Sequence, residues 1–130
     1  MVPLRTPAAD AVSAADVAYA LGDLFACRAA FDTVYRLLLA KDFEDASPLL
    51  FRPPIARFEG SLTQVVTAPG LAPEDRVAIS ALRLDVGRSI DELTTALEEQ
   101  DAKAGRRFAK AARSSLDEIL SRCEAGGLLE

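Results

Sequence analysis

Apolar residues recur at alternating steps of three and four in four separate stretches of this chain. The clearest series consists of Val17, Ala20, Leu24, Cys27, Phe31, Val34 and Leu38. This spacing keeps one apolar stripe on the same side of an α-helix, and such a stripe needs partner helices to cover it. No strand-like run lies between the four stretches. The sequence therefore predicts an all-α fold, an up-down-up-down four-helix bundle.

The other three expected helices are separated by strong helix breakers. Pro69-Gly70 divides the second helix from the third, and Gly126-Gly127 follows the fourth. Short links of this kind make successive helices antiparallel. The predicted buried positions are Ile55, Phe58, Leu62 and Val65 in the second helix, Ile79, Leu82, Val86, Ile90, Leu93 and Leu97 in the third, and Phe108, Ala112, Leu116, Ile119 and Cys123 in the fourth.

Capping residues indicate where the helices begin. The first helix has two candidate starts, which are Thr6 before a proline and Ser13 with Asp16 three residues later. Residues 1–6 are interpreted as an extended lead-in. Asp101 is expected to cap the fourth helix, because an aspartate side chain accepts a hydrogen bond from the first helical turn.

Residues 43–54 connect the first and second helices. Ser47-Pro48 favours one short extra helical turn, and Pro53-Pro54 ends it, because a residue before proline avoids the helical conformation. Residues 1–130 are long enough to bury a core, so we expect a single helical-bundle domain.

Three further residues lead to specific expectations. Gly87 interrupts the third helix, either as a tolerated glycine or as a point where a neighbouring helix approaches closely.

Cys27 and Cys123 lie roughly 20 Å apart if the first and last helices are antiparallel, whereas a disulfide needs Cα atoms about 4.4–6.8 Å apart. We therefore predict two unpaired, buried thiols.

Charge and composition exclude several classes of function. The net charge is −5, whereas nucleic-acid-binding domains are usually basic. The chain has no histidine, which excludes a Ser-His-Asp triad and the Glu-x-x-His pairs of di-metal bundles. The acidic clusters at residues 42–45, 91–92 and 98–101 lack the spacing of a calcium loop, and we interpret them as solvated carboxylates. We expect no catalytic residue, no metal and no cofactor.

Cations concentrate in the fourth helix. Five of the fifteen Lys and Arg residues fall within eleven positions, on one face of the helix, with no acid between them: Lys103, Arg106, Arg107, Lys110 and Arg113. This stripe is either a solvated outer face or a docking surface for an acidic partner. Arg52, in the connector, is a further candidate docking residue.

Several segments of the chain follow one another in a characteristic order. They are Leu37-Leu38-Leu39-Ala40-Lys41-Asp42-Phe43, then Leu49-Leu50-Phe51-Arg52-Pro53-Pro54, then Phe58-Glu59-Gly60-Ser61-Leu62, and later Ile90-Asp91-Glu92-Leu93, Ala109, Ser114-Ser115-Leu116 and Ile119-Leu120. Over roughly residues 17–122, this order resembles that of the PsbQ-like proteins of the thylakoid lumen. The resemblance implies a four-helix-bundle extrinsic protein of the chloroplast. Its expected function is that of a non-catalytic accessory subunit or assembly factor in photosynthesis, docked on the lumenal side of photosystem II or a related complex.

The expected partners are therefore subunits of a larger photosynthetic membrane complex. We expect the chain to be peripheral to the membrane, since no apolar run approaches the roughly 20 residues of a transmembrane span, and to be monomeric when free. No targeting segment is visible, so a lumenal protein would be present here in its mature form. The alternative is a cytosolic helical adaptor or self-associating module unrelated to photosynthesis. An enzyme that uses only carboxylates or arginine is a weaker alternative.

Overall fold

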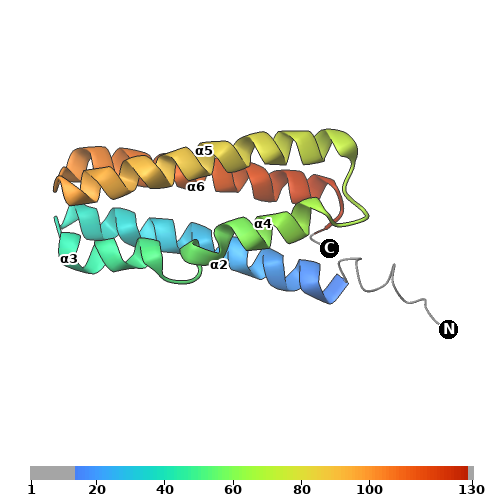
Figure 1. Cartoon of the computed structure of the whole chain (residues 1–130), viewed down its shortest axis with the longest axis horizontal. Helices are drawn as coiled ribbons and strands as arrows, with labels where there is room; N and C mark the ends of the chain where they lie inside the picture. Colours follow the sequence, from blue (N-terminus) through green and yellow to red (C-terminus); the bar gives the residue numbers. More distant parts are fainter. Residues whose placement is uncertain (1–13, 129–130) are drawn as a thin grey trace.

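The computed structural model describes residues 14–128, and within that range the chain forms helices and no strand. Helices α2, α4, α5 and α6 alternate in direction along one long axis (Figure 1), which confirms the predicted up-down-up-down four-helix bundle. The elements are α2 (Ala14–Leu39), α3 (Phe43–Ala46), the 3₁₀ turns η1 (Ser47–Phe51) and η2 (Ile55–Arg57), α4 (Phe58–Val66), α5 (Pro73–Glu98) and α6 (Ala102–Ala125).

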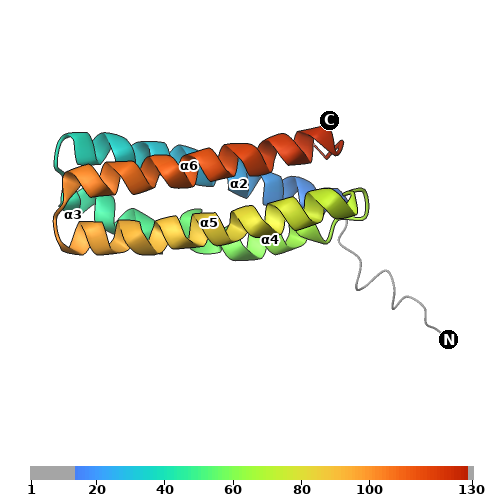
Figure 2. The same cartoon turned by 90° about the horizontal axis from the view of Figure 1, so that it is seen from above.

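The four main helices form a closed ring around the core. Helix α2 packs against α6 and α4, and α5 packs against the same two helices, so α4 and α6 lie diagonally opposite each other (Figure 2). Helix α4 has 9 residues whereas α5 has 26, so α4 covers only part of the length of its neighbours. The connector fills the remaining length, and its turn η1 packs against α5. No helix among the described residues is both long enough and apolar enough to cross a membrane.

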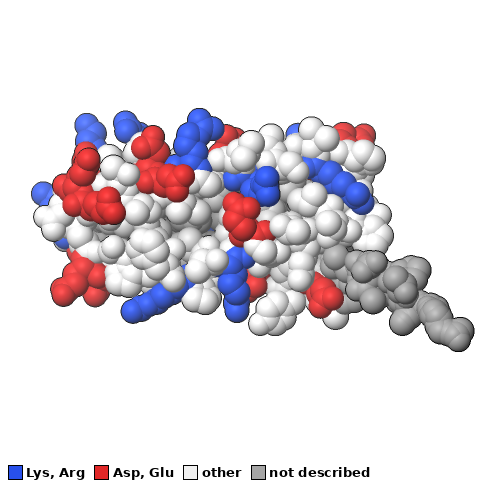
Figure 3. Space-filling view, viewed as in Figure 1, with Lys and Arg blue, Asp and Glu red and all other residues white. Residues whose placement is uncertain are grey.

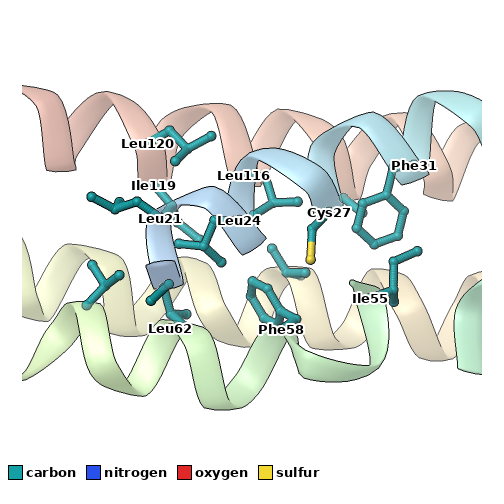
Figure 4. Close-up of a cluster of buried hydrophobic side chains, with 14 of the residues drawn as sticks. Leu21, Leu24, Cys27, Phe31, Ile55, Phe58, Leu62, Leu116, Ile119 and Leu120 are labelled. Carbon is teal, nitrogen blue, oxygen red and sulfur yellow. The ribbon is translucent and has the colours of Figure 1, made fainter. Parts of the chain in front are cut away.

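The predicted apolar stripes form this core. All seven predicted positions of α2 and all four of the second expected helix are buried, and Figure 4 shows Leu24, Phe58 and Leu116 meeting from three helices. Three residues that were predicted to be buried are only partly buried, namely Leu82 and Ile90 in α5 and Phe108 in α6. A stripe about 100° wide leaves its edge positions half-exposed.

The helix ends agree with the predicted caps wherever they are described. The carboxylate of Asp101 accepts a hydrogen bond from the backbone N–H of Ala104 at 3.1 Å. Helix α6 ends before Gly126, and Gly127 has a φ of 85°, a conformation that glycine adopts without strain. The extended lead-in and both candidate starts, Thr6 and Ser13, lie outside the described residues.

The connector contains one more element than predicted. The turn expected at Ser47-Pro48 is present as η1, but α3 precedes it. Asp42 caps α3, since its carboxylate accepts a hydrogen bond from the backbone N–H of Asp45 at 3.1 Å. A single turn of helix has no apolar periodicity, which explains why the pattern of residues did not predict it.

The close approach between two helices occurs at Gly105 and not at Gly87. A Cβ atom added to Gly87 would meet nothing within 4 Å, so the close-approach interpretation of Gly87 is wrong and this glycine is merely tolerated. A Cβ added to Gly105 would lie 2.7 Å from Cδ1 of Leu38. The tight contact is therefore between α6 and the end of α2.

Both cysteines are unpaired and buried, as predicted. The thiol of Cys27 donates a hydrogen bond to the carbonyl oxygen of Pro54 at 3.1 Å and so links α2 to the connector. Burial, with a smaller effect of Asp23, raises the pKa of Cys27 to about 12. Burial, with a smaller effect of Asp75, raises the pKa of Cys123 to about 11. Both thiols are therefore protonated at neutral pH.

Candidate functional site

The five predicted docking cations lie along the amino-terminal half of α6. A helix advances 100° per residue, so positions 103, 106, 107, 110 and 113 fall within an arc of about 120°. Three of the cations are exposed, at the centre of this arc and on one side of it: Lys103, Arg107 and Lys110. The other two, Arg106 and Arg113, are half-buried on the opposite side of the arc, which faces α2. The stripe therefore divides into an outer and an inner part.

The inner part is used for packing within the bundle. Nε of Arg113 lies 3.1 Å from Oδ1 of Asp32 on α2, an ion pair whose geometry does not include a hydrogen bond from that nitrogen. Nη1 of Arg106 donates to the backbone oxygen of Leu38 at 3.5 Å, which places a positive charge at the carboxyl end of α2. These two arginines hold α6 against α2, so docking alone does not account for them.

The outer part consists of Lys103, Arg107 and Lys110, which we call the outer trio. Within residues 14–128, no ion pair of 4.0 Å or less involves any of the three. The guanidinium carbon of Arg107 lies 4.8 Å from the ring centroid of Phe108, a cation–π contact on the same helix. The outer trio therefore presents three positive charges that no acid of the described residues pairs with directly.

The position of Lys103 does not stabilise α6. The amino-terminal end of a helix carries a partial positive charge, so a cation in the first turn is unfavourable. Lys103 lies in the first turn of α6, which has no acidic residue, whereas the first turn of α5 carries Glu74 and Asp75. Local helix energetics therefore do not explain the cation at position 103.

Acidic residues surround the same end of the bundle. They are Asp42, Glu44 and Asp45 around α3, and Glu98, Glu99 and Asp101 at the turn between α5 and α6. Figure 3 shows acidic side chains gathered at this end of the molecule. We call these six residues the acidic rim.

A groove joins the acidic rim to the outer trio. It has a volume of about 610 Å³, and its lining includes Phe43, Glu99, Asp101, Lys103 and Arg106. Asp42 raises the pKa of Asp45, first through hydrogen bonding with this residue and then through charge repulsion. Among the described residues, no group of three or more potential ligands is arranged to hold a metal ion. The groove therefore brings acidic and basic side chains to one surface of the bundle.

The structure does not bring Arg52 next to the stripe. Arg52 is exposed directly after η1, and η1 packs against α3, η2 and α5. Helix α6 packs against α2 and α5 instead. One flat partner surface therefore cannot readily contact Arg52 and the outer trio together.

Sequence reasoning missed a second polar site, between α2 and α4. There Asp23 accepts hydrogen bonds from Arg57 at 3.1 Å and from Ser61 at 3.0 Å. The only signal in the sequence was Arg57 and Ser61 four positions apart, a spacing that places two side chains on one helix face. Nothing in the sequence connected that pair to Asp23, which lies 34 positions before Arg57.

Known proteins do not identify the role of the outer trio and the acidic rim. No family model, no curated protein and no solved structure matches this chain. The function of this end of the bundle is therefore inferred from its geometry and from the resemblance described above.

Proposed function

We propose that this protein is a non-catalytic accessory subunit or assembly factor that docks, through the outer trio of α6, on an acidic surface of a photosynthetic membrane complex. The resemblance to PsbQ-like proteins favours photosystem II or a related complex as the partner, and the thylakoid lumen as the location. The observation that supports docking most is the absence of any ion pair for Lys103, Arg107 and Lys110 among the described residues.

The chemistry of the surface supports this role. Exposed cations contribute little to the stability of a monomer, so three that form no ion pair with residues 14–128 are available to a partner. Complementary charges between two proteins determine orientation and association rate more than affinity. The acidic rim beside the outer trio sharpens this orientation, because it repels any partner surface that is uniformly acidic.

The test is recovery of complexes from detergent-solubilised thylakoids with the tagged protein, at low and at moderate salt. The variant reverses the charge of the outer trio, with Lys103→Glu, Arg107→Glu and Lys110→Glu. The matched control reverses three cations on other helices, with Arg36→Glu, Arg83→Glu and Arg88→Glu, and so changes the net charge by the same amount.

We expect the unmodified protein and the control to recover one photosynthetic complex at low salt, with lower recovery at moderate salt. The outer-trio variant is expected to recover little. Equal loss in the variant and the control would mean that net charge, rather than this surface, governs binding. Recovery of no thylakoid complex by the unmodified protein at low salt would refute the proposed location and partner.

A second candidate function is a self-associating module, and the acidic rim favours it. The rim residues 98–101 directly precede the outer trio along the chain. If the α6 helices of two copies were in antiparallel contact, the rim residues of one copy would therefore lie opposite the outer trio of the other copy. Sedimentation velocity distinguishes the two functions. The docking function predicts a monomer at low salt, whereas a salt-sensitive dimer that the outer-trio variant abolishes would support self-association.

A further inference from the structure

The groove between α2 and α4 contains polar groups that neither the core nor the α6 surface uses. Its volume is about 370 Å³, and it is lined by Tyr19, Ala20, Asp23, Ala56, Arg57, Gly60, Ser61 and Gln64. Helix α4 lies diagonally across the bundle from α6 (Figures 1 and 2). A partner bound to the outer trio therefore leaves this groove open.

Asp23 holds the neighbouring polar side chains of the groove in position. Its side chain is only 14% exposed, and both of its oxygens accept hydrogen bonds. Oδ1 accepts from Nη2 of Arg57 at 3.1 Å, and Oδ2 accepts from Oγ of Ser61 at 3.0 Å. Because these two contacts occupy both oxygens, Asp23 holds Arg57 in position and offers little to a ligand itself.

Arg57 is the group available to a ligand. Its side chain is 51% exposed, and the ion pair with Asp23 uses Nη2 of a guanidinium that carries five N–H donors. A guanidinium held in one orientation matches the two oxygens of a carboxylate. The exposed side chains of Tyr19 and Gln64 add an O–H and an N–H donor at the edge of the groove. Asp23 is the only acid among the described residues of the lining and it is paired with Arg57, so no second carboxylate in this lining repels an anionic ligand.

Gly60 leaves space beside these donors. It lies within α4, where glycine is less favourable than alanine, yet a Cβ atom at this position would meet nothing within 4 Å. Packing within the bundle therefore does not require glycine here. The missing side chain keeps the groove open along the α4 backbone.

We infer that this groove binds a carboxylate, with Arg57 as the principal contact and with Tyr19 and Gln64 as additional donors. Asp23 and Ser61 act as positioning residues that hold the guanidinium in place. The carboxylate belongs either to an acidic side chain of a protein or to a small free acid, and both present the same two oxygens to Arg57.

The experiment is titration of the ¹⁵N-labelled full chain, observed by NMR at the backbone amide of Gly60 and at Nε of Arg57. The probes are propionate, the blocked tripeptide glycyl-glutamyl-glycine and its glutaminyl counterpart. We expect the glutamyl peptide to shift both signals and the glutaminyl peptide to leave them unchanged. Comparable shifts with propionate indicate a small acid as the natural ligand, and shifts with the peptide alone indicate a protein.

Variants separate binding from folding. Arg57→Gln is expected to weaken binding of the glutamyl peptide by about tenfold, because it removes charge-assisted hydrogen bonds. Arg83→Gln is the matched control, since Arg83 pairs with Glu59 and does not line the groove, and it should bind as the unmodified protein does. In Asp23→Asn, the Nε signal of Arg57 should move towards that of free arginine as affinity falls. Equal shifts with the glutamyl and glutaminyl peptides, or unchanged binding in Arg57→Gln, would overturn the inference.

Discussion

The body of the bundle and the end formed by α3 and the α5–α6 turn use their charged residues differently. In the body, ion pairs cross every seam between neighbouring elements of the ring; they are Arg28–Asp117 and Arg113–Asp32 between α2 and α6, Arg122–Asp75 between α6 and α5, Arg83–Glu59 between α5 and α4, and Arg57–Asp23 between η2 and α2. At the end formed by α3 and the α5–α6 turn, the charged residues within 41–45 and 98–110 form no ion pair within 4.0 Å among the described residues.

This difference indicates two uses of charge in one small protein. In the body, opposite charges face each other across helices and help to fix how the helices align. At the α3 end, acids and cations lie close together in the chain but form no ion pair with each other or with any other described residue, so their charges are available to another molecule. Stability should therefore depend on the body, and docking of the acidic partner surface should depend on the end.

The largest expected effect concerns the core of the body. Leu116→Ala removes a fully buried side chain and should lower the free energy of unfolding by about 2–5 kcal/mol. Leu39→Ala, at the α3 end, removes a side chain that is 59% exposed and should change it by about 0.5 kcal/mol or less. Urea unfolding measures both values, and comparable losses would contradict the division into a stabilising body and a binding end.

The second prediction concerns the contact between Gly105 and Leu38. Any Cβ atom at position 105 lies 2.7 Å from Cδ1 of Leu38, so Gly105→Val forces side-chain atoms into occupied space and should cost about 1–3 kcal/mol. Gly87→Ala is the control, because its Cβ meets nothing and alanine favours helix by about 1 kcal/mol. Thermal unfolding should show opposite shifts for the two variants. A neutral Gly105→Val would mean that α6 is free to move away from α2.

The buried thiols predict a loss of stability at high pH. Their pKa values are about 12 and 11 in the folded state against 9.0 for the ordinary thiol, so the unfolded state loses its protons first. Their contribution is complete below pH 9 and declines as the pH rises towards 11–12, by at most about 1.4 kcal/mol per pH unit for each thiol. Urea unfolding at several pH values should show a shallower decline for Cys27→Ala with Cys123→Ala than for the unmodified protein, and an unchanged slope would contradict the burial argument.

The smallest effect should come from the ion pairs. A double-mutant cycle with Arg28→Ala and Asp117→Ala should give a coupling energy of about 0.2–1 kcal/mol, since both side chains are partly exposed. The matched cycle uses Glu99→Ala and Lys103→Ala, which line one groove without an ion pair and should show no coupling. Equal coupling in the two cycles would remove the distinction between body and end.

The sequence was sufficient to predict the fold because helix periodicity is a local property. Positions such as Leu24 and Leu116 repeat at the spacing of a helix face, and breakers such as Pro69-Gly70 mark the ends. Asp101 was predicted as a cap because capping depends on residues only three positions apart. The edges of the stripes, at Leu82 and Phe108, were less predictable, since their burial depends on where the neighbouring helices lie.

The candidate site was only partly predictable, because pairing between distant residues is not a local property. The sequence placed five cations on one face of α6 but did not show that Arg113 pairs with Asp32, 81 positions earlier. It also did not indicate that Gly105, rather than Gly87, packs closely against another helix. Division of the stripe into inner and outer parts therefore required the tertiary structure.

The most direct test of the account is the ratio of thylakoid complex recovered by the outer-trio variant to that recovered by the control variant. The outer-trio variant should change the free energy of unfolding by about 0.5 kcal/mol or less, because exposed charges contribute little to stability. The control removes the ion pairs of Arg83 with Glu59 and of Arg88 with Asp85 and should lose somewhat more, so urea unfolding first establishes that both variants are folded under the binding conditions. We expect recovery close to that of the unmodified protein for the control, and little recovery when Lys103, Arg107 and Lys110 are reversed. Equal recovery by the two folded variants would contradict the claim that the unpaired cations of α6 form the docking surface.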